Sequence, residues 1–147
     1  MPVIKALQKH KVVFDTHVFL WYMEENPKLS TKFLNSIERL HKFSPVLISP
    51  LTLWEISLLA ERGRIVLEMD CLDWIEKALL WPGCQLAPIT PQIAVLSNRL
   101  PGNIHKDPVD RMLIATSFEN KAVLVTCDEA ILEYGKNHFI SVCDPRK

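Results

Sequence analysis

The chain has 147 residues, of which 48% are hydrophobic and 23% are charged. This length and composition are those of one globular domain with a proper hydrophobic core. Lys and Arg together number 17, as do Asp and Glu, so bulk charge gives no indication of a polyanionic partner, and any nucleic-acid contact needs a local basic patch.

The cysteines indicate a reducing compartment. Cys71, Cys84, Cys127 and Cys143 form no C-x-x-C pair and lie in or near apolar segments. This pattern suits reduced, buried thiols better than a disulfide framework or a zinc site. No apolar run is long enough to span a bilayer, and the first residues lack a signal-peptide core. We therefore expect a cytoplasmic protein with no membrane partner.

Apolar patterning predicts alternating strands and helices along the chain. Residues 1–10 form an N-terminal extension that could be a short helix, a frayed end or part of a partner surface. In chain order, the strands are predicted at 11–15, 45–49, 85–89, 122–126 and 139–142, with a brief extended stretch at 64–67. The helices between them are predicted at 18–23, 31–42, 51–62, from 70 or 71 to about 80, from 90 or 91 to 99 or 100, at 109–120 and at 129–134, with a loop at 101–106.

This alternation predicts a three-layer α/β/α sandwich with a mainly parallel central sheet, formed by residues 11–147 as a single domain. Three local signals support the boundaries. Thr90 and Pro91 are a cap and a first helical residue, and Gly63 is placed to end a helix. Pro88 indicates that its strand lies at an edge of the sheet or ends there.

Two predicted strands reach an aspartate at their carboxyl ends. Asp15 ends the run Val12-Val13-Phe14, and Asp128 follows Ala122–Thr126. In a parallel sheet these ends share one edge, which is where α/β proteins bind ligands. Each aspartate could equally cap the helix that follows. The Thr126 hydroxyl group could cap or orient the same edge.

Two more acids lie where helices leave this edge. Glu55 is expected in the first turn after the second strand, although Thr52 and Glu55 also have capping-box spacing. In Asp107-Pro108-Val109-Asp110, we expect Asp107 to cap the helix and Asp110 to point into the cleft.

Four acids at one edge repel one another unless a cation compensates their charge. Oxygen ligands without His or Cys favour Mg²⁺ or Mn²⁺ over zinc, and such ions serve phosphoryl-transfer chemistry. The sequence has no phosphate-cradling glycine loop and no G-x-S-x-G elbow. The histidines lack metal-site spacing and are expected to be structural or at the surface. The four tryptophans, which lie on apolar stripes, are expected to pack in the core.

The ordered motifs resemble the PIN domain family, and specifically VapC-type toxins of toxin–antitoxin pairs. The resemblance extends from about Lys11 to Val142. The matching segments are Phe14-Asp15-Thr16-His17, Ser49 to Ile56, His105 to Arg111 with Leu113 to Thr116, and Val125 to Asp128. Two features differ from the family pattern: the extension at residues 1–10, and Cys127, where many relatives carry a basic or small residue.

The resemblance implies a metal-dependent endoribonuclease with Asp15, Glu55, Asp110 and Asp128 as its acidic site. Asp15 and Asp110 would be the leading ligands of Mg²⁺ or Mn²⁺, Asp128 would complete the site, and Glu55 would bind the metal or position water. Family members usually form homodimers, and a cognate antitoxin silences them by placing its tail in the pocket.

Basic residues near these motifs are candidates for phosphate contacts to an RNA substrate. They are His105, Lys106, Arg111, Arg62 and Arg64, and for the last two a solvated face or antitoxin binding is the preferred interpretation. Two other functions stay open from the residues alone: a phosphoryl-accepting domain of receiver type, and a PIN-like module that only binds a partner.

Overall fold

The computed structural model describes residues 11–104, 107–137 and 139–147. In this part of the chain five strands form one sheet, in which every neighbouring pair is parallel. The strands are β1 (Lys11–Phe14), β2 (Val46–Ile48), β3 (Cys84–Leu86), β4 (Ala122–Val125) and β5 (Ser141–Cys143). Their order in the sheet is β3-β2-β1-β4-β5, so the chain reverses its direction of winding between β1 and β4.

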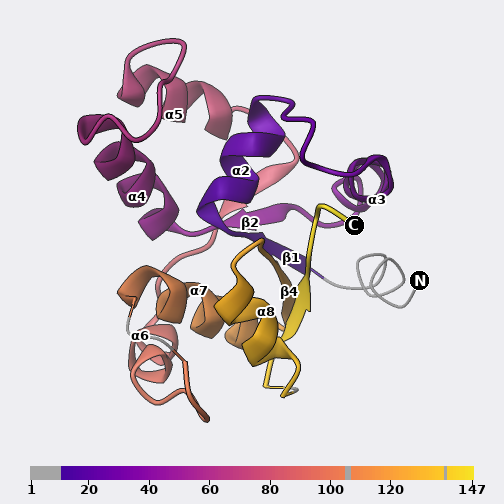
Figure 1. Ribbon diagram of the computed structural model, residues 1–147, viewed down its shortest axis with the longest axis vertical. Coiled ribbons are helices and arrows are strands. Elements are labelled where there is room, and N and C mark those ends of the chain that lie inside the picture. Colours follow the sequence, from indigo (N-terminus) through magenta and orange to yellow (C-terminus); the bar gives the residue numbers. More distant parts are fainter. Residues whose placement is uncertain (1–10, 105–106, 138) are drawn as a thin grey trace.

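Helices cover both faces of the sheet (Figure 1). They are α2 (Thr16–Met23), α3 (Thr31–Leu40), α4 (Pro50–Glu61), α5 (Cys71–Leu79), α6 (Pro91–Ser97), α7 (Pro108–Glu119) and α8 (Glu129–Gly135). In Figure 1, α2, α3, α4 and α5 lie on one side of the sheet, and α7 and α8 lie on the other, with α6 packed against α7. The predicted α/β/α sandwich is confirmed.

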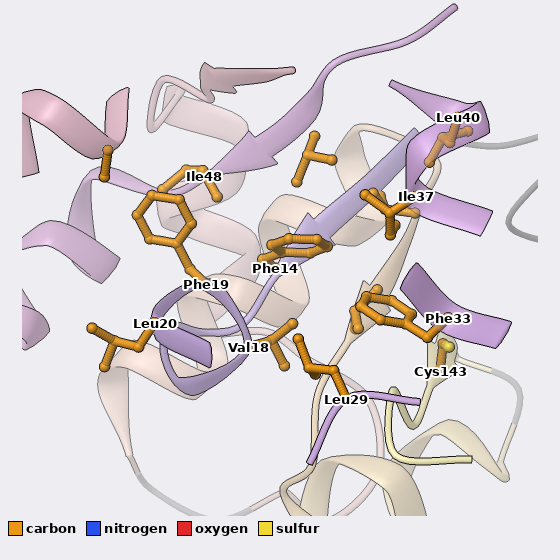
Figure 2. Packing of buried hydrophobic residues seen from close by; sticks show 14 of the residues in the cluster. Phe14, Val18, Phe19, Leu20, Leu29, Phe33, Ile37, Leu40, Ile48 and Cys143 are labelled. Carbon is orange, nitrogen blue, oxygen red and sulfur yellow. The ribbon is translucent and has the colours of Figure 1, made fainter. Parts of the chain in front are cut away.

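Alternating strand residues divide the core into two layers. In β1, Val12 and Phe14 face the layer that contains α2, α3, α4 and α5, whereas Val13 faces the layer of α7 and α8. The same period of two holds in β4, as it must when both faces of a strand are buried. Figure 2 shows the first layer, where Phe14 lies among Val18, Leu29, Phe33 and Ile37.

Most of the predicted elements are present, with ends that differ by a few residues. The third strand lies at an edge of the sheet, as Pro88 indicated. Gly63, with φ of +66°, directly follows Arg62, the C-cap residue of α4, and Thr90 is the N-cap residue of α6. No strand forms at 64–67, where a brief extended stretch was expected.

The N-terminal extension and the end of the loop at 101–106 lie outside the described residues. Within the described part, no helix is both long and apolar enough to cross a membrane.

Candidate active site

Asp15 lies at the carboxyl end of β1 and also caps α2. Its carboxylate accepts a hydrogen bond from the backbone N–H of Thr16 at 2.6 Å and one from the Thr126 hydroxyl group at 2.6 Å. Only 8% of Asp15 is exposed. The capping and cleft interpretations therefore describe the same side chain, since one oxygen faces the helix start and the other faces β4.

Thr126 connects Asp15 to Asp128. Its hydroxyl group donates to Asp15 and accepts from the backbone N–H of Asp128 at 3.0 Å. Asp128 in turn caps α8 by accepting from the N–H of Ile131 at 3.0 Å. The orienting role predicted for Thr126 is confirmed, and Asp128 caps a helix at the same edge as Asp15.

Glu55 reaches this edge from a different turn than predicted. The residue that caps α4 is Ser49, whose hydroxyl accepts from the N–H of Leu51 at 3.1 Å. The capping-box interpretation of Thr52 and Glu55 is therefore wrong, and Glu55 lies in the second turn of α4 instead of the first. Thr52 is fully buried and accepts a 3.5 Å hydrogen bond from the Thr16 hydroxyl.

Asp107 and Asp110 divide their roles at the start of α7 largely as expected. The Asp107 carboxylate accepts from the N–H groups of Val109 at 2.9 Å and Asp110 at 3.2 Å, and Pro108 occupies the first turn. Both aspartates line the cleft described next, so Asp107 is at once a cap and a neighbour of the other acids.

All four predicted site residues line one pocket of about 380 Å³. We call it the acidic pocket, and its lining residues are Asp15, His17, Trp21, Glu55, Asp107, Asp110, Cys127 and Asp128. It lies at the carboxyl ends of β1 and β4, which is where the winding of the sheet reverses and where ligands of α/β sheets bind.

Besides Asp107, which was expected only as a helix cap, three of the pocket-lining residues were not predicted as site residues. His17 is exposed and Trp21 is half-buried, and both lie on α2. Their four-residue spacing puts them one helical turn apart on the same face, and this spacing is the sequence signal that could have found them. Cys127 is the third. Burial raises the pKa of the Cys127 thiol to about 11, so it is a neutral side chain at neutral pH.

Burial and mutual repulsion perturb the acids. Burial raises the pKa of Asp15, and its hydrogen bonds to Thr126 and Thr16 oppose this effect. Burial likewise raises the pKa of Glu55, against an interaction with the Thr16 hydroxyl. The pKa of Asp110 rises to about 8, first through burial and then through the negative charges of the neighbouring acids.

The donor set fits a hard divalent cation. The four predicted ligands offer carboxylate oxygens alone, and a cation would relieve the repulsion that, after burial, raises the pKa of Asp110. Within residues 11–104, 107–137 and 139–147, however, no three acidic, His or Cys side chains already have the spacing of a metal site. The fit therefore rests on donor chemistry and shared location.

Several residues with predicted roles lie elsewhere. The guanidinium of Arg111 donates to the carbonyl oxygens of Ser97 at 2.8 Å and Ile104 at 3.5 Å, so it ties a loop to α7. Arg62 and Arg64 are exposed and do not line the acidic pocket. His105 and Lys106 lie outside the described residues.

The core prediction for tryptophan holds for Trp74, which is buried in the first layer, and for Trp81, which packs against it. It is wrong for Trp54, which is 56% exposed. Trp21 has a double character, since it packs against the core and also lines the acidic pocket.

Three comparisons identify relatives of this chain. The family model described as PIN domain matches residues 12–137. Ribonuclease VapC22 of Mycobacterium tuberculosis (strain ATCC 25618 / H37Rv) is 31% identical over 120 residues, which are 82% of this chain and 88% of that protein.

Solved structures share the fold at low sequence identity. VapBC-1 from nontypeable Haemophilus influenzae matches with a TM-score of 0.67 and 17% identity, covering 92% of this chain and 98% of that one. VapBC2 from Rickettsia felis, bound to a promoter DNA fragment, matches with a TM-score of 0.66 and 14% identity, covering 90% and 96%. The family model and the 31% identical relative establish that this chain belongs to the PIN domain family.

Proposed function

We propose that this protein is a divalent-metal-dependent endoribonuclease that acts as the toxin of a toxin–antitoxin pair. The observation that carries the proposal is the acidic pocket, which gathers Asp15, Glu55, Asp110 and Asp128 at one edge of the sheet. The 31% identical relative is named a ribonuclease, and divalent-metal dependence is typical of PIN-domain ribonucleases. The proposal includes a cytoplasmic location, where an RNA substrate would be met.

In the proposed mechanism, Asp15 and Asp110 would be the leading ligands of Mg²⁺ or Mn²⁺, and Asp128 would complete the site. The bound ion would lower the pKa of water and neutralise charge on the leaving oxygen. Glu55 positions or deprotonates the water that attacks phosphorus, and the P–O bond to the leaving ribose oxygen breaks. Thr126 holds the Asp15 carboxylate in one orientation by its hydrogen bond.

The direct test replaces Asp15 by Asn. Asn keeps an oxygen that can cap α2, but it lacks the charge that a metal ligand needs. We expect Asp15→Asn to abolish metal-dependent cleavage of total RNA and to relieve growth inhibition on expression, while circular dichroism shows an intact fold. Asp73→Asn, an exposed acid in the first turn of α5, is the matched control and should cleave normally. Undiminished cleavage by Asp15→Asn would overturn the proposal.

A cognate antitoxin and a homodimeric state are parts of the same proposal. Their support is the likeness of the chain to VapC-type toxins and to the solved VapBC assemblies. If a small protein encoded immediately upstream is the antitoxin, its co-expression should restore growth, and the small protein should co-purify with this chain. Failure of any neighbouring product to do so would contradict the toxin–antitoxin part while leaving nuclease activity to the Asp15 test.

No observation favours either of the two alternatives, a receiver-type domain or a PIN-like module that only binds a partner. Receiver domains of the CheY type have the strand order 2-1-3-4-5, whereas the order here is β3-β2-β1-β4-β5. A module that only binds a partner has no need of acids whose pKa values are raised together at one pocket. A titration in which neither Mg²⁺ nor Mn²⁺ binds would revive that interpretation.

A further inference from the structure

The acidic pocket has one aromatic wall. Trp21 lines the pocket from α2, and His17, one helical turn earlier, lines it beside Trp21. The two ring centroids are 6.3 Å apart and the rings meet edge to face, at 66°. Because the other lining residues are five acids and a neutral thiol, this wall is the part of the pocket that can accept a flat, apolar group.

Lys28 places a positive charge on this aromatic wall. Its ammonium nitrogen lies 4.8 Å from the centroid of the Trp21 ring, the geometry of a cation–π contact. Lys28 is exposed, so its ammonium can also reach a solvent-side anion. It is close enough to the acidic pocket to lower the pKa of Cys127 electrostatically, against the larger effect of burial.

The turn after α2 brings the chain back towards Trp21. Glu25 has φ of +55°, a left-handed conformation that is uncommon for a residue other than glycine. The N–H of Asn26 donates to the Trp21 carbonyl at 2.9 Å, and the Asn26 side chain accepts from the N–H of Lys28 at 2.9 Å. These contacts fix the Lys28 backbone relative to the tryptophan.

An indole beside a cation, next to a phosphoryl-transfer site, is the combination that binds single-stranded nucleic acid. Bases stack on aromatic rings with little sequence preference, and lysines contact the flanking phosphates. We propose that Trp21 stacks on a base of single-stranded RNA next to the scissile phosphate, and that the exposed Lys28 side chain moves off the indole face to bind a neighbouring phosphate. This inference rests on the proposed function, and it adds the residues that position the RNA.

The test compares two probes that differ only in their bases: a short fluorescent oligoadenylate and an abasic oligomer with the same ribose-phosphate backbone. Affinities are measured by anisotropy in Ca²⁺, which takes oxygen ligands, and a gel checks that the probe is uncut. We expect the wild-type protein to prefer oligoadenylate by about 5- to 150-fold, the range of one base–aromatic stack.

Substitutions of tryptophan show which residue causes the preference for oligoadenylate over the abasic oligomer. Trp21→Leu should bring the ratio of the two affinities close to one, and Trp21→Phe, which keeps a smaller ring, should retain part of it. Trp54→Leu, which removes an exposed indole from outside the pocket, should keep the full ratio. Denaturant unfolding of each variant checks that it folds.

Lys28→Met tests the phosphate contact. It should weaken the binding of both probes by a similar factor, and the slope of log affinity against log salt should fall by about 0.7, the value for one contact to a single strand. An unchanged slope would overturn this part of the proposal.

The inference and the proposed function fail in different ways. A wild-type ratio near one, or a ratio that Trp21→Leu leaves intact, overturns the stacking inference even if the protein cleaves RNA. Conversely, absence of cleavage of total RNA with Mg²⁺ or Mn²⁺ overturns the nuclease proposal, whereas the binding ratio does not depend on cleavage.

Discussion

At the scale of single residues, the Thr126 hydroxyl group organises the acidic pocket. It is fully buried, donates to one Asp15 oxygen at 2.6 Å and accepts from the Asp128 backbone at 3.0 Å. A buried carboxylate that accepts such a bond is held in one rotamer, and its charged form is favoured. Thr126 therefore opposes the effect of burial, which raises the pKa of Asp15.

Replacing Thr126 by Val tests this role, because Val keeps the shape of the side chain and removes the hydroxyl. We expect Thr126→Val to destabilise the protein by about 1–3 kcal/mol, since Asp15 loses a buried donor. The pKa of Asp15 should rise further, so that cleavage needs a higher pH. Urea unfolding and a pH–rate profile measure the two effects, and Thr126→Ser, which restores the hydroxyl, should recover most of both. A Val variant with unchanged stability and pH profile would refute the assignment.

The residues that could be predicted from the sequence are those whose position in the chain determines their place. Asp15 directly follows one apolar strand and Asp128 lies three residues after the end of another, so topology determines their edge of the sheet. Trp21 is harder to assign, because an aromatic residue on an apolar helix has the same pattern whether it faces the core or the rim of a pocket. Only its four-residue spacing from His17 connects it to this edge. The role of Arg111 depends on the carbonyl groups of Ser97 and Ile104, which no sequence pattern reveals.

At the scale of elements, strand pairing decides boundaries that the apolar pattern leaves open. The last strand was predicted at 139–142, but β5 is Ser141–Cys143 because those residues pair with Val123 to Val125 in β4. Phe139 instead packs its ring against Tyr134 of α8, at 5.3 Å. The turn that carries Glu55 was misplaced for a different reason. Ser49 caps α4, so the helix begins at Pro50, earlier than the apolar stripe indicated.

The approach of α8 to β5 depends on Gly135. A Cβ atom added there would lie 2.4 Å from a Val142 methyl group, so Gly135→Ala should destabilise the protein by about 1–3 kcal/mol, as overpacking does. It should also reduce cleavage, because α8 is the helix that Asp128 caps.

The double variant Gly135→Ala/Val142→Ala separates the clash from other effects of the new methyl group. Removing the Val142 methyl groups should relieve it, so denaturant unfolding should show a non-additive free energy for the pair. Additive effects of the two substitutions would contradict the packing argument.

At the scale of the whole molecule, an equal number of acidic and basic residues conceals a local excess of negative charge. The net charge is zero, yet five carboxylates line one pocket. Folding of the metal-free protein therefore works against their repulsion, and a bound divalent cation would remove much of that cost. In the proposed function metal binding and stability are therefore coupled, and the pH dependence of this coupling follows from Asp110.

Burial and the neighbouring acids raise the pKa of Asp110 from its ordinary value of 3.8 to about 8 in the folded protein. Between these values the folded state binds more protons than the unfolded state, so the stability contributed by this group falls as the pH rises. A metal competes with the same proton, so its stabilisation grows over the same range. We expect Mg²⁺ or Mn²⁺ to raise the free energy of unfolding little near pH 5, and by about 2.7 kcal/mol near pH 8 at a hundredfold excess over Kd.

Asp110→Asn isolates this group. Without metal, the variant should be more stable than the wild type near pH 8 by about 1 kcal/mol, a value limited by solvent screening of the half-exposed carboxyl, and the difference should vanish near pH 4. With metal, the order should reverse, because the variant lacks one of the proposed ligands. Urea unfolding at each pH measures the stability of the wild type and of the variant, each with and without metal. A metal-free wild type that gains stability relative to Asp110→Asn as the pH rises would show that burial and the neighbouring acids do not hold Asp110 protonated.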